Sequence, residues 1–187
     1  MKNSQLKQPL FLCGMMGSGK STAGRKLADR LDAPFLDLDA QIVREAGMEI
    51  PQIFEEKGEE WFRNLERTLL IRESQQFNGV MALGGGSLQN QRVVDHLKVY
   101  GWLVFLNVPK SVILERLLGS KNRPKLKSNQ PGSETDQLDR TITQLLEQRL
   151  PFYKQAQITI DTGSATPPEI AEMIIKKIKI YDGYNRH

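Results

Sequence analysis

The sequence has little of what marks several large protein classes. Its 187 residues include one cysteine, Cys13, so an internal disulfide is excluded. Cys13 lies in an apolar run, where a free thiol usually packs as a small buried hydrophobic group. The two histidines, His96 and His187, are isolated, and no Cys/His cluster indicates a zinc site. The sequence therefore predicts neither a disulfide scaffold nor a structural metal.

Long hydrophobic runs are also missing. No window approaches the length of a membrane span, and the apolar stretch at residues 10–13 is too short for the core of a signal peptide. We therefore expect a cytoplasmic protein that does not associate with a membrane.

Charge of one sign is in modest excess but is not concentrated anywhere. The chain has 26 lysines and arginines against 22 acidic residues, a net charge of +4, and aromatic residues make up only 7%. No cluster of five or six basic residues occurs, which argues against a nucleic-acid partner. A small positive excess instead suits an enzyme whose ligands are anions. With 39% hydrophobic residues, residues 1–187 suit one folded domain with a substantial core.

Short apolar segments alternate with helical patterns along the chain. Strands are expected at residues 10–13, 33–38, 79–83, 102–108 and 157–160. Helices are expected at residues 21–31, 40–57 (as one or two helices), 59–76, 90–98, from 109 onward, and 168–181. This alternation predicts an α/β fold with a parallel sheet covered on both faces. Residues 119–136 are polar and rich in Lys, Ser, Asn, Pro and Gly, which fits either a plain surface loop or a mobile lid.

One motif is specific. Residues 14–21 read Gly-Met-Met-Gly-Ser-Gly-Lys-Ser and match the phosphate-binding pattern G-x-x-x-x-G-K-[ST] in full. The glycines allow a tight turn whose N–H groups point at phosphate oxygens, and the following helix adds its positive dipole end. Lys20 is expected to reach the β- and γ-phosphates, and the Ser21 hydroxyl to bind magnesium. The motif follows a predicted strand and precedes a predicted helix, which is the arrangement that this loop requires.

Two carboxylates stand where the second predicted strand ends. Asp37 and Asp39 are two residues apart, so in a strand their side chains face the same side. They can converge in the ligand crevice at the end of the sheet, one near magnesium and the other beside a substrate hydroxyl as base or hydrogen-bond partner. The alternative is structural, because Asp39 precedes Ala40 and Asp is a preferred helix N-cap.

Two further features have both a structural and a functional interpretation, and a third, Arg149, has a structural one. Arg63 and Glu66 are either a solvated surface pair or a partly buried pair in which Glu66 holds the guanidinium for carboxylate recognition. Three consecutive glycines at residues 84–86 follow a predicted strand, as a tight turn or as N–H groups presented to a ligand. Arg149 sits near a helix end, where a cation also complements the helix dipole.

Taken in order, these motifs resemble the shikimate kinase family. The resemblance runs from about residue 9 to about residue 180. Its pieces are Gly19-Lys20-Ser21-Thr22, Asp37-Leu38-Asp39, Gly58-Glu59 with Phe62-Arg63 and Glu66, Gly84-Gly85-Gly86, Arg123-Pro124, Arg149-x-Pro151-x-Tyr153, and Ile160-Asp161-Thr162 before Pro167. The phosphate-binding loop is common to many families, whereas the ordered set is highly specific.

The resemblance implies a fold and a reaction. The implied fold is a P-loop NTPase similar to nucleoside monophosphate kinases, with a five-stranded parallel sheet sandwiched between helices. A helical segment at about residues 40–76 would bind the substrate, and a mobile lid would span about residues 119–136. The implied reaction is ATP-dependent phosphorylation of the 3-hydroxyl of shikimate, giving shikimate 3-phosphate and ADP in aromatic amino-acid biosynthesis. The enzyme is expected to use Mg²⁺ and to act as a cytoplasmic monomer.

The resemblance also assigns site residues. Those implied to bind ATP are Gly17, Ser18, Gly19, Lys20, Ser21, Thr22, Arg116, Arg123 and Pro167. Those implied to bind shikimate are Asp39, Arg63, Gly84, Gly85, Gly86 and Arg149. Ser21 and Asp37 would belong to the magnesium site, Asp37 directly or through water, and Glu66 would orient Arg63. The residues expected to act in catalysis are Lys20, Asp39 and Arg123, with Asp39 either a true base or a positioning group.

Three rival functions are open at this point. A gluconate kinase is the nearest, because gluconate is also a polyhydroxy carboxylate and would suit two arginines and an aspartate. A nucleotide-binding regulator would bind ATP without acceptor-dependent release of ADP. A nucleic-acid-dependent ATPase would be stimulated by DNA or RNA, and the missing basic cluster argues against it.

Overall fold

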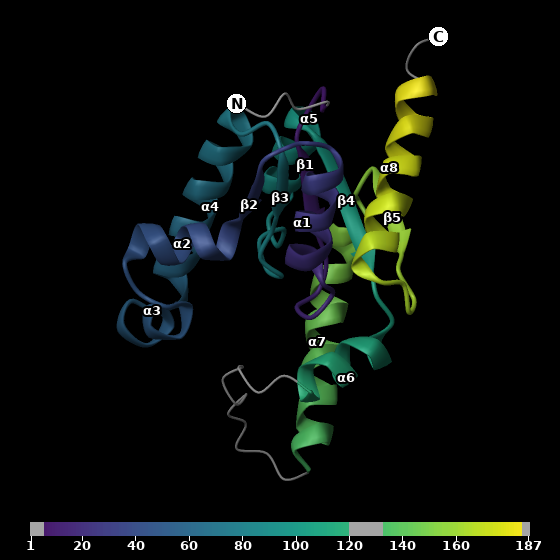
Figure 1. Ribbon diagram of the computed structural model, residues 1–187. Coiled ribbons are helices and arrows are strands. Elements are labelled where there is room, and N and C mark those ends of the chain that lie inside the picture. Colours follow the sequence, from purple (N-terminus) through teal and green to yellow (C-terminus); the bar gives the residue numbers. More distant parts are fainter. Residues whose placement is uncertain (1–5, 120–132, 185–187) are drawn as a thin grey trace.

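The fold is organised around a parallel sheet that lies in the middle of the molecule (Figure 1). The computed structural model describes residues 6–119 and 133–184. The strands are β1 (Leu10–Cys13), β2 (Phe35–Asp37), β3 (Val80–Ala82), β4 (Trp102–Asn107) and β5 (Ile158–Asp161). They form a five-stranded sheet in the order β2-β3-β1-β4-β5, and all paired strands are parallel. The predicted fold class is confirmed.

Strand β1 occupies the centre of the sheet because it can be buried on both faces. Leu12 pairs with Ala82 of β3 on one side and with Val104 of β4 on the other. All four residues of β1 are fully buried, which explains why this strand reads as a continuous apolar run without alternation.

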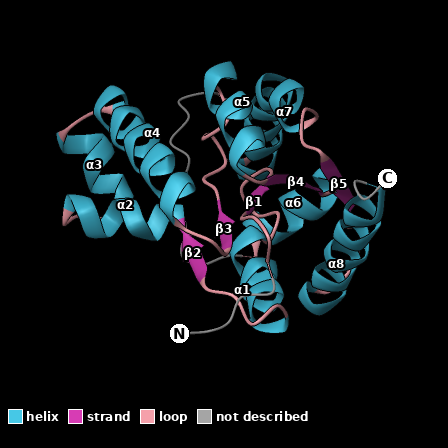
Figure 2. Ribbon diagram, turned by 90° about the horizontal axis from the view of Figure 1, so that it is seen from above, coloured by secondary structure: helices cyan, strands magenta, loops and turns pink. Residues whose placement is uncertain are grey.

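Helices cover both faces of the sheet (Figure 2). They are α1 (Lys20–Arg30), α2 (Leu38–Ala46), α3 (Ile50–Glu56), α4 (Glu59–Gln76), α5 (Gln91–Tyr100), α6 (Lys110–Leu118), α7 (Glu134–Tyr153) and α8 (Pro167–Tyr184). Leu10 and Leu12 of β1 pack against α1 and α8, whereas Phe11 and Cys13 point to the other face, toward α4, α5 and α7. This alternation is the period of two expected for a strand.

Helices α2, α3 and α4 form an arm beside the β2 edge of the sheet (Figures 1 and 2). Of the one or two helices expected over residues 40–57, two are present, since Gly47 ends α2 with a φ of 67° and α3 begins at Ile50, next to Pro51. Gly58, with a φ of 83°, then separates α3 from α4. Positive φ angles cost glycine little, so the chain can reverse direction at both positions.

The junction between β2 and α2 differs from the prediction. Strand β2 ends at Asp37, and Asp39 lies in the first turn of α2 rather than on the strand. The N-cap is Asp37, whose Oδ1 accepts hydrogen bonds from the N–H groups of Asp39 (3.1 Å) and Ala40 (3.4 Å). Asp37 is the last extended residue, so its carboxylate is the one that reaches the free N–H groups of the helix. The structural alternative, in which Asp39 is the N-cap, is therefore wrong.

The long helix α7 is an element that the strand and helix patterns above did not include. It starts inside the range 119–136 assigned to a loop or lid, at a capping box formed by Ser133 and Asp136. Ile142, Leu145 and Leu146 then recur at helical spacing, a signal that could have identified it. Residues 120–132, which hold most of the predicted lid, lie outside the described residues.

None of the helices in residues 6–119 and 133–184 is both long enough and apolar enough to cross a bilayer.

Candidate active site

The loop between β1 and α1 has the geometry of a phosphate cradle. Gly14, Gly17 and Gly19 all have positive φ angles, of 140°, 77° and 86°. At Gly14 a side chain is excluded twice over, since a Cβ there would also lie 2.8 Å from the carbonyl oxygen of Leu106. Helix α1 begins at Lys20 without a side-chain cap, and the N-terminus of a helix is a favourable place for an anion.

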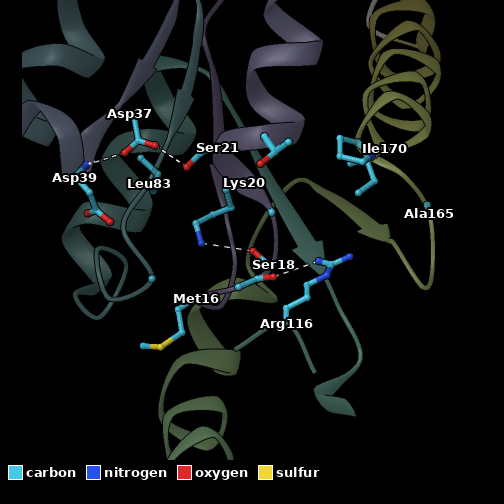
Figure 3. A pocket seen from close by; sticks show the side chains of 15 residues that line it. Met16, Ser18, Lys20, Ser21, Asp37, Asp39, Leu83, Arg116, Ala165 and Ile170 are labelled. Atoms are coloured by element: carbon cyan, nitrogen blue, oxygen red, sulfur yellow. Dashed lines mark hydrogen bonds between the residues drawn. The ribbon is translucent and has the colours of Figure 1, made fainter. Parts of the chain in front are cut away.

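Lys20 is buried within this loop (Figure 3). Its Nζ donates hydrogen bonds of 2.9 Å to the carbonyl oxygens of both Gly14 and Met15, and lies 3.5 Å from Ser18 Oγ. The loop backbone thus holds the ammonium group beside the N-terminus of α1. Two sources of positive potential coincide at this point, as a polyphosphate requires.

Ser21 and Asp37 place two oxygen donors side by side. Ser21 Oγ lies 2.5 Å from Asp37 Oδ2, while the other carboxylate oxygen of Asp37 caps α2. Within the described ranges, His, Cys, Asp and Glu side chains do not gather in groups of three that could hold a metal by themselves. A site with two hard oxygen donors fits Mg²⁺, which usually keeps several waters and takes further ligands from substrate phosphates.

Asp39 carries a shifted pKa. Its carboxyl reaches solvent in the cleft but is surrounded by protein on most sides, and this burial raises its pKa from 3.8 to about 6. The negative charges of Asp37 and Glu66 also raise the pKa, whereas Lys20 and Arg63 lower it. A carboxylate with a pKa near 6 is mostly ionised at neutral pH and is a better proton acceptor than an ordinary aspartate.

Arg63 and Glu66 form a partly buried pair on α4. Arg63 Nη1 lies 2.7 Å from Glu66 Oε2, and the exposed fraction of the side chain is 27% for Arg63 but only 5% for Glu66. The Arg63 guanidinium carbon also lies 5.0 Å from the centroid of the Phe62 ring, and Arg63 Nε donates a hydrogen bond of 3.3 Å to Glu59 Oε1. Of the two interpretations of this pair, the solvated surface pair is excluded.

The three consecutive glycines, residues 84–86, are named here the glycine loop, and they bring distant charged groups together. A Cβ on Gly84 would lie 2.8 Å from both Asp39 Oδ1 and Glu66 Oε1. A Cβ on Gly86 would lie 2.7 Å from Arg63 Nη1. The absence of side chains here is therefore what allows Asp39, Glu66 and Arg63 to share one location, and the predicted close approach of backbone is confirmed.

Arg149 approaches the same loop from α7. It is 7% exposed, its Nη1 lies 3.2 Å from the position of a Cβ on Gly85, and it contacts Met15 Sδ at 3.9 Å. The Nε of Arg149 has no hydrogen-bond partner among the described residues. Tyr153, one turn further along α7, donates its hydroxyl to the Gly85 carbonyl, and burial raises the pKa of this phenol. A buried guanidinium with an unused donor is suited to receive an anion.

One cavity of about 490 Å³ joins the cradle to the acidic residues (Figure 3). From the predicted site it is lined by Gly17, Ser18, Gly19, Lys20, Ser21, Thr22, Asp37, Asp39, Gly85, Arg116 and Pro167. The cavity lining does not include Arg63, Gly84, Gly86 or Arg149; Arg63 lies against Gly86 and Arg149 against Gly85. Arg123 lies outside the described residues.

The structure adds residues that sequence reasoning missed at the nucleotide end. Ala165 and Ile170 line the cavity next to Pro167, just beyond the carboxyl end of β5. Their position after a predicted strand was the sequence signal that could have identified them, because ligands of open α/β sheets bind outside the carboxyl ends of the strands. Arg116, exposed on α6, closes this end by donating from Nη1 to the Gly17 carbonyl at 3.2 Å.

A phosphate cradle that opens into the same cavity as a carboxylate of raised pKa places the chain among the small P-loop kinases, which phosphorylate a small acceptor molecule. Within that class the comparison with known families is specific. The family model for shikimate kinase matches residues 16–179, and the chain belongs to the shikimate kinase family.

Individual relatives agree with this membership. The chain is 38% identical over 167 residues to the shikimate kinase of Caldanaerobacter subterraneus subsp. tengcongensis, covering 89% of this chain and 94% of that protein. Its structure superposes with a TM-score of 0.85 on shikimate kinase from Acinetobacter baumannii solved in complex with shikimate, at 34% identity and over 95% and 96% of the two chains. A gluconokinase from Sinorhizobium meliloti 1021 reaches a TM-score of 0.58 at 17% identity, covering 97% and 99%, which shows a shared fold alone.

Proposed function

We propose that this chain transfers the γ-phosphoryl group of ATP to the 3-hydroxyl of shikimate, giving ADP and shikimate 3-phosphate in aromatic amino-acid biosynthesis. Membership of the shikimate kinase family supplies the reaction. The observation that carries the proposal at the level of residues is that Asp39 and the phosphate cradle line one cavity. A donor phosphate in the cradle and an acceptor hydroxyl at Asp39 would then be neighbours, as direct transfer requires.

On the nucleotide side, the backbone of residues 14–19 would hold the phosphates. Lys20 would neutralise charge on the β- and γ-phosphates, since its ammonium already lies inside the loop. The other end of the cavity would enclose the base of the nucleotide. It is lined by Arg116, Ala165, Pro167 and the buried side chain of Ile170. The φ angles of Gly14 and Gly19 support the assignment of the phosphates to this loop, because they turn the loop N–H groups toward one centre.

Magnesium would be held by Ser21 Oγ and Asp37 Oδ2, with its other positions left to water and phosphate oxygens. When bound, it neutralises the charge that builds up on the transferring phosphoryl group. Asp37 is restrained for this task because its second oxygen caps α2, so the carboxylate cannot rotate away without unmaking the cap.

On the acceptor side, the chemistry of shikimate matches the residues present. Shikimate has one carboxylate and three hydroxyl groups, so it needs at least one fixed cation and an acceptor of hydroxyl hydrogen bonds. Arg63, held by Glu66, and Arg149, with its unused Nε donor, would bind the carboxylate. The glycine loop and Asp39 would contact the ring and its hydroxyls. The Acinetobacter baumannii structure, which contains shikimate, supports an acceptor site of this kind in the family.

Asp39 would act on the hydroxyl that attacks the phosphorus. With its pKa raised to about 6, the carboxylate can hydrogen-bond this hydroxyl, orient its oxygen toward the γ-phosphate and take the proton as the bond to phosphorus forms. Phosphoryl transfer depends mainly on such alignment and on charge neutralisation. The roles predicted for Arg123 and for a lid at 119–136 stay predictions, as do the single-domain organisation, the cytoplasmic location and the monomeric state.

The decisive experiment measures ADP release from ATP and magnesium with shikimate, with gluconate, and with neither. Strong stimulation by shikimate alone, with shikimate 3-phosphate identified by phosphorus NMR, is the expected result. Stimulation by gluconate would identify a gluconate kinase instead. Binding of ATP without stimulation by either acceptor would overturn the acceptor assignment and favour a nucleotide-binding regulator. Stimulation by DNA or RNA would point to a nucleic-acid-dependent ATPase.

A further inference from the structure

Ser87 is a buried serine that belongs to none of the motifs described above. It follows the glycine loop directly and is 7% exposed. Its Oγ donates a hydrogen bond of 2.7 Å to Glu66 Oε1, and its backbone N–H bonds the Gly84 carbonyl at 3.2 Å. One residue therefore ties the glycine loop, which follows β3, to the helix α4 that carries Arg63.

Glu66 accepts a hydrogen bond at each of its two carboxylate oxygens. Its Oε2 accepts from Arg63 Nη1 and its Oε1 accepts from Ser87 Oγ, both at 2.7 Å. The terminal torsion of a glutamate is soft, so a hydrogen bond at each oxygen is what determines the plane of the carboxylate. Because the Glu66 side chain is only 5% exposed, water cannot easily replace a lost donor.

The bond from Ser87 also lies on the side of Glu66 that faces the acceptor residues. The position that a Cβ on Gly84 would occupy is 2.8 Å from Glu66 Oε1, 2.8 Å from Asp39 Oδ1 and 2.9 Å from Ser87 Oγ. Two carboxylates thus approach each other across Gly84. A hydrogen bond donated to Oε1 draws negative charge away from the side that Asp39 meets, which eases the repulsion between them.

We propose that Ser87 is a positioning residue of the acceptor site: it holds the Glu66 carboxylate, and through Glu66 it sets the direction in which Arg63 presents its guanidinium to the carboxylate of the acceptor. This inference rests on the proposed function, because it assigns the acceptor carboxylate to Arg63. Ser87 acts through Glu66 and is assigned no contact with either substrate.

Steady-state kinetics with three serine variants test the proposal. Ser87→Ala should raise the shikimate KM about tenfold, as expected for losing a hydrogen bond to a charged group, and change the ATP KM less than about twofold. Ser87→Thr keeps the hydroxyl and should restore most of the affinity. The control is Ser74→Ala, which removes a buried hydroxyl on α4 that is hydrogen-bonded to the Ile71 carbonyl and to His96 Nε2, away from the site. It should leave both KM values unchanged.

A double-mutant cycle tests the route through Glu66. Once Glu66→Ala has removed the carboxylate, adding Ser87→Ala should change the shikimate KM no further, because coupled residues are not additive. An unchanged KM in Ser87→Ala, an equal loss of ATP affinity, or full additivity with Glu66→Ala would each overturn the proposal.

Two further measurements distinguish a loss of the Ser87 hydrogen bond from a folding defect and from a failure of the proposed function. Thermal unfolding of each variant shows whether it is folded, and Ser87→Cys, similar in size but a weak donor, replaces Ser87→Ala if that protein does not fold. Absence of shikimate-stimulated ADP release in the unchanged protein would refute the proposed function itself. Activity in the unchanged protein together with full activity in the folded Ser87 variants would refute the role of Ser87 alone.

Discussion

The two halves of the site are built in different ways. The phosphate cradle comes from one continuous segment, residues 14–22. Its geometry resides in backbone torsions, and the Lys20 side chain lies inside it. The acceptor half is built from side chains of separate segments, α2, α4, the glycine loop and α7, which meet only in the folded chain. Arg149 of the acceptor half contacts Met15 of the cradle, although the two residues are 134 positions apart in sequence.

This difference explains how the two halves can vary independently. A backbone cradle binds any polyphosphate, because N–H groups and a helix N-terminus recognise charge rather than a particular molecule. Side chains on several elements can instead be exchanged one at a time to suit a particular acceptor. Substitutions in the cradle should therefore affect turnover with every acceptor, whereas substitutions in the acceptor half should affect shikimate selectively.

The largest effect is expected in the cradle. Lys20→Ala removes the ammonium from the phosphate loop and should lower kcat by about a thousandfold or more, because the charge of the transferring group is no longer neutralised. ADP release under saturating shikimate measures it. Lys26→Ala, which removes an exposed lysine from the same helix, serves as the control and should retain full activity. Undiminished turnover in Lys20→Ala would remove the argument for the cradle.

In the acceptor half the largest expected effect is at Arg149. Arg149→Ala should raise the shikimate KM about a hundredfold and leave ATP binding nearly intact, because a charge-assisted contact to the acceptor carboxylate is lost. Titrations of each substrate separate the two effects. Arg149→Met keeps the apolar stem and should behave like Arg149→Ala, whereas Arg140→Ala changes an exposed arginine of α7 and should have no effect. Equal loss of affinity for both substrates would contradict the assignment of Arg149 to the acceptor half.

A smaller effect is expected from a methyl group added to the glycine loop. Gly84→Ala places a Cβ 2.8 Å from the oxygens of Asp39 and Glu66, and these side chains must move apart. The shikimate KM should rise about tenfold with little change for ATP, since small misplacements of binding groups are costly. Gly14→Ala is the matched change in the cradle, where φ is 140° and the clash is with a backbone oxygen. Gly14→Ala should impair folding or ATP binding instead. A loss of affinity for shikimate alone in Gly14→Ala would show that the two halves of the site do not bind their ligands separately.

The smallest expected effect concerns stability and its dependence on pH. Because the folded pKa of Asp39, about 6, is above its ordinary value of 3.8, the ionised carboxylate opposes folding above pH 6. This cost falls as the pH drops from 6 to 3.8 and is absent below 3.8. Asp39→Asn should therefore raise the melting temperature at pH 7.5 while lowering activity, and the gain should shrink as the pH falls through this window.

Thermal unfolding of the two proteins over a series of pH values measures this difference. Asp95→Asn, which changes an exposed aspartate on α5, controls for the loss of one negative charge. A melting-temperature gain that is the same at pH 7.5 and pH 4 would show that the fold does not oppose ionisation of Asp39.

Much of the fold followed from local patterns. Apolar runs located the five strands, and their alternation with helices indicated a parallel sheet. The i, i+3 spacing of Arg63 and Glu66 predicted a contact that the structure contains, at 2.7 Å. The end of β2 was misplaced because Asp37 and Asp39 are equally good caps by residue type, and only the path of the backbone decides which one reaches the helix.

The parts of the site that sequence reasoning missed are those that depend on contacts between segments. Ser87 and Glu66 are 21 positions apart, and nothing in either local pattern relates them. Ala165 and Ile170 are ordinary apolar residues whose type does not indicate a ligand, and their place at the cavity follows from their position beyond the carboxyl end of β5. The capping box at Ser133 and Asp136 was a readable local signal for α7 that the apolar patterning alone did not use.

The phosphate cradle and the family can be read from local sequence, since a glycine pattern specifies torsions locally and an ordered set of motifs can be compared directly. The chemistry of the acceptor half depends on how separate segments come together in the fold. The raised pKa of Asp39 arises from burial and from the negative charges of Asp37 and Glu66. The Nε donor of Arg149 has no hydrogen-bond partner among the described residues because it is buried beside the glycine loop. These properties depend on distances across the fold, and electrostatic interactions follow distance in space rather than separation in sequence.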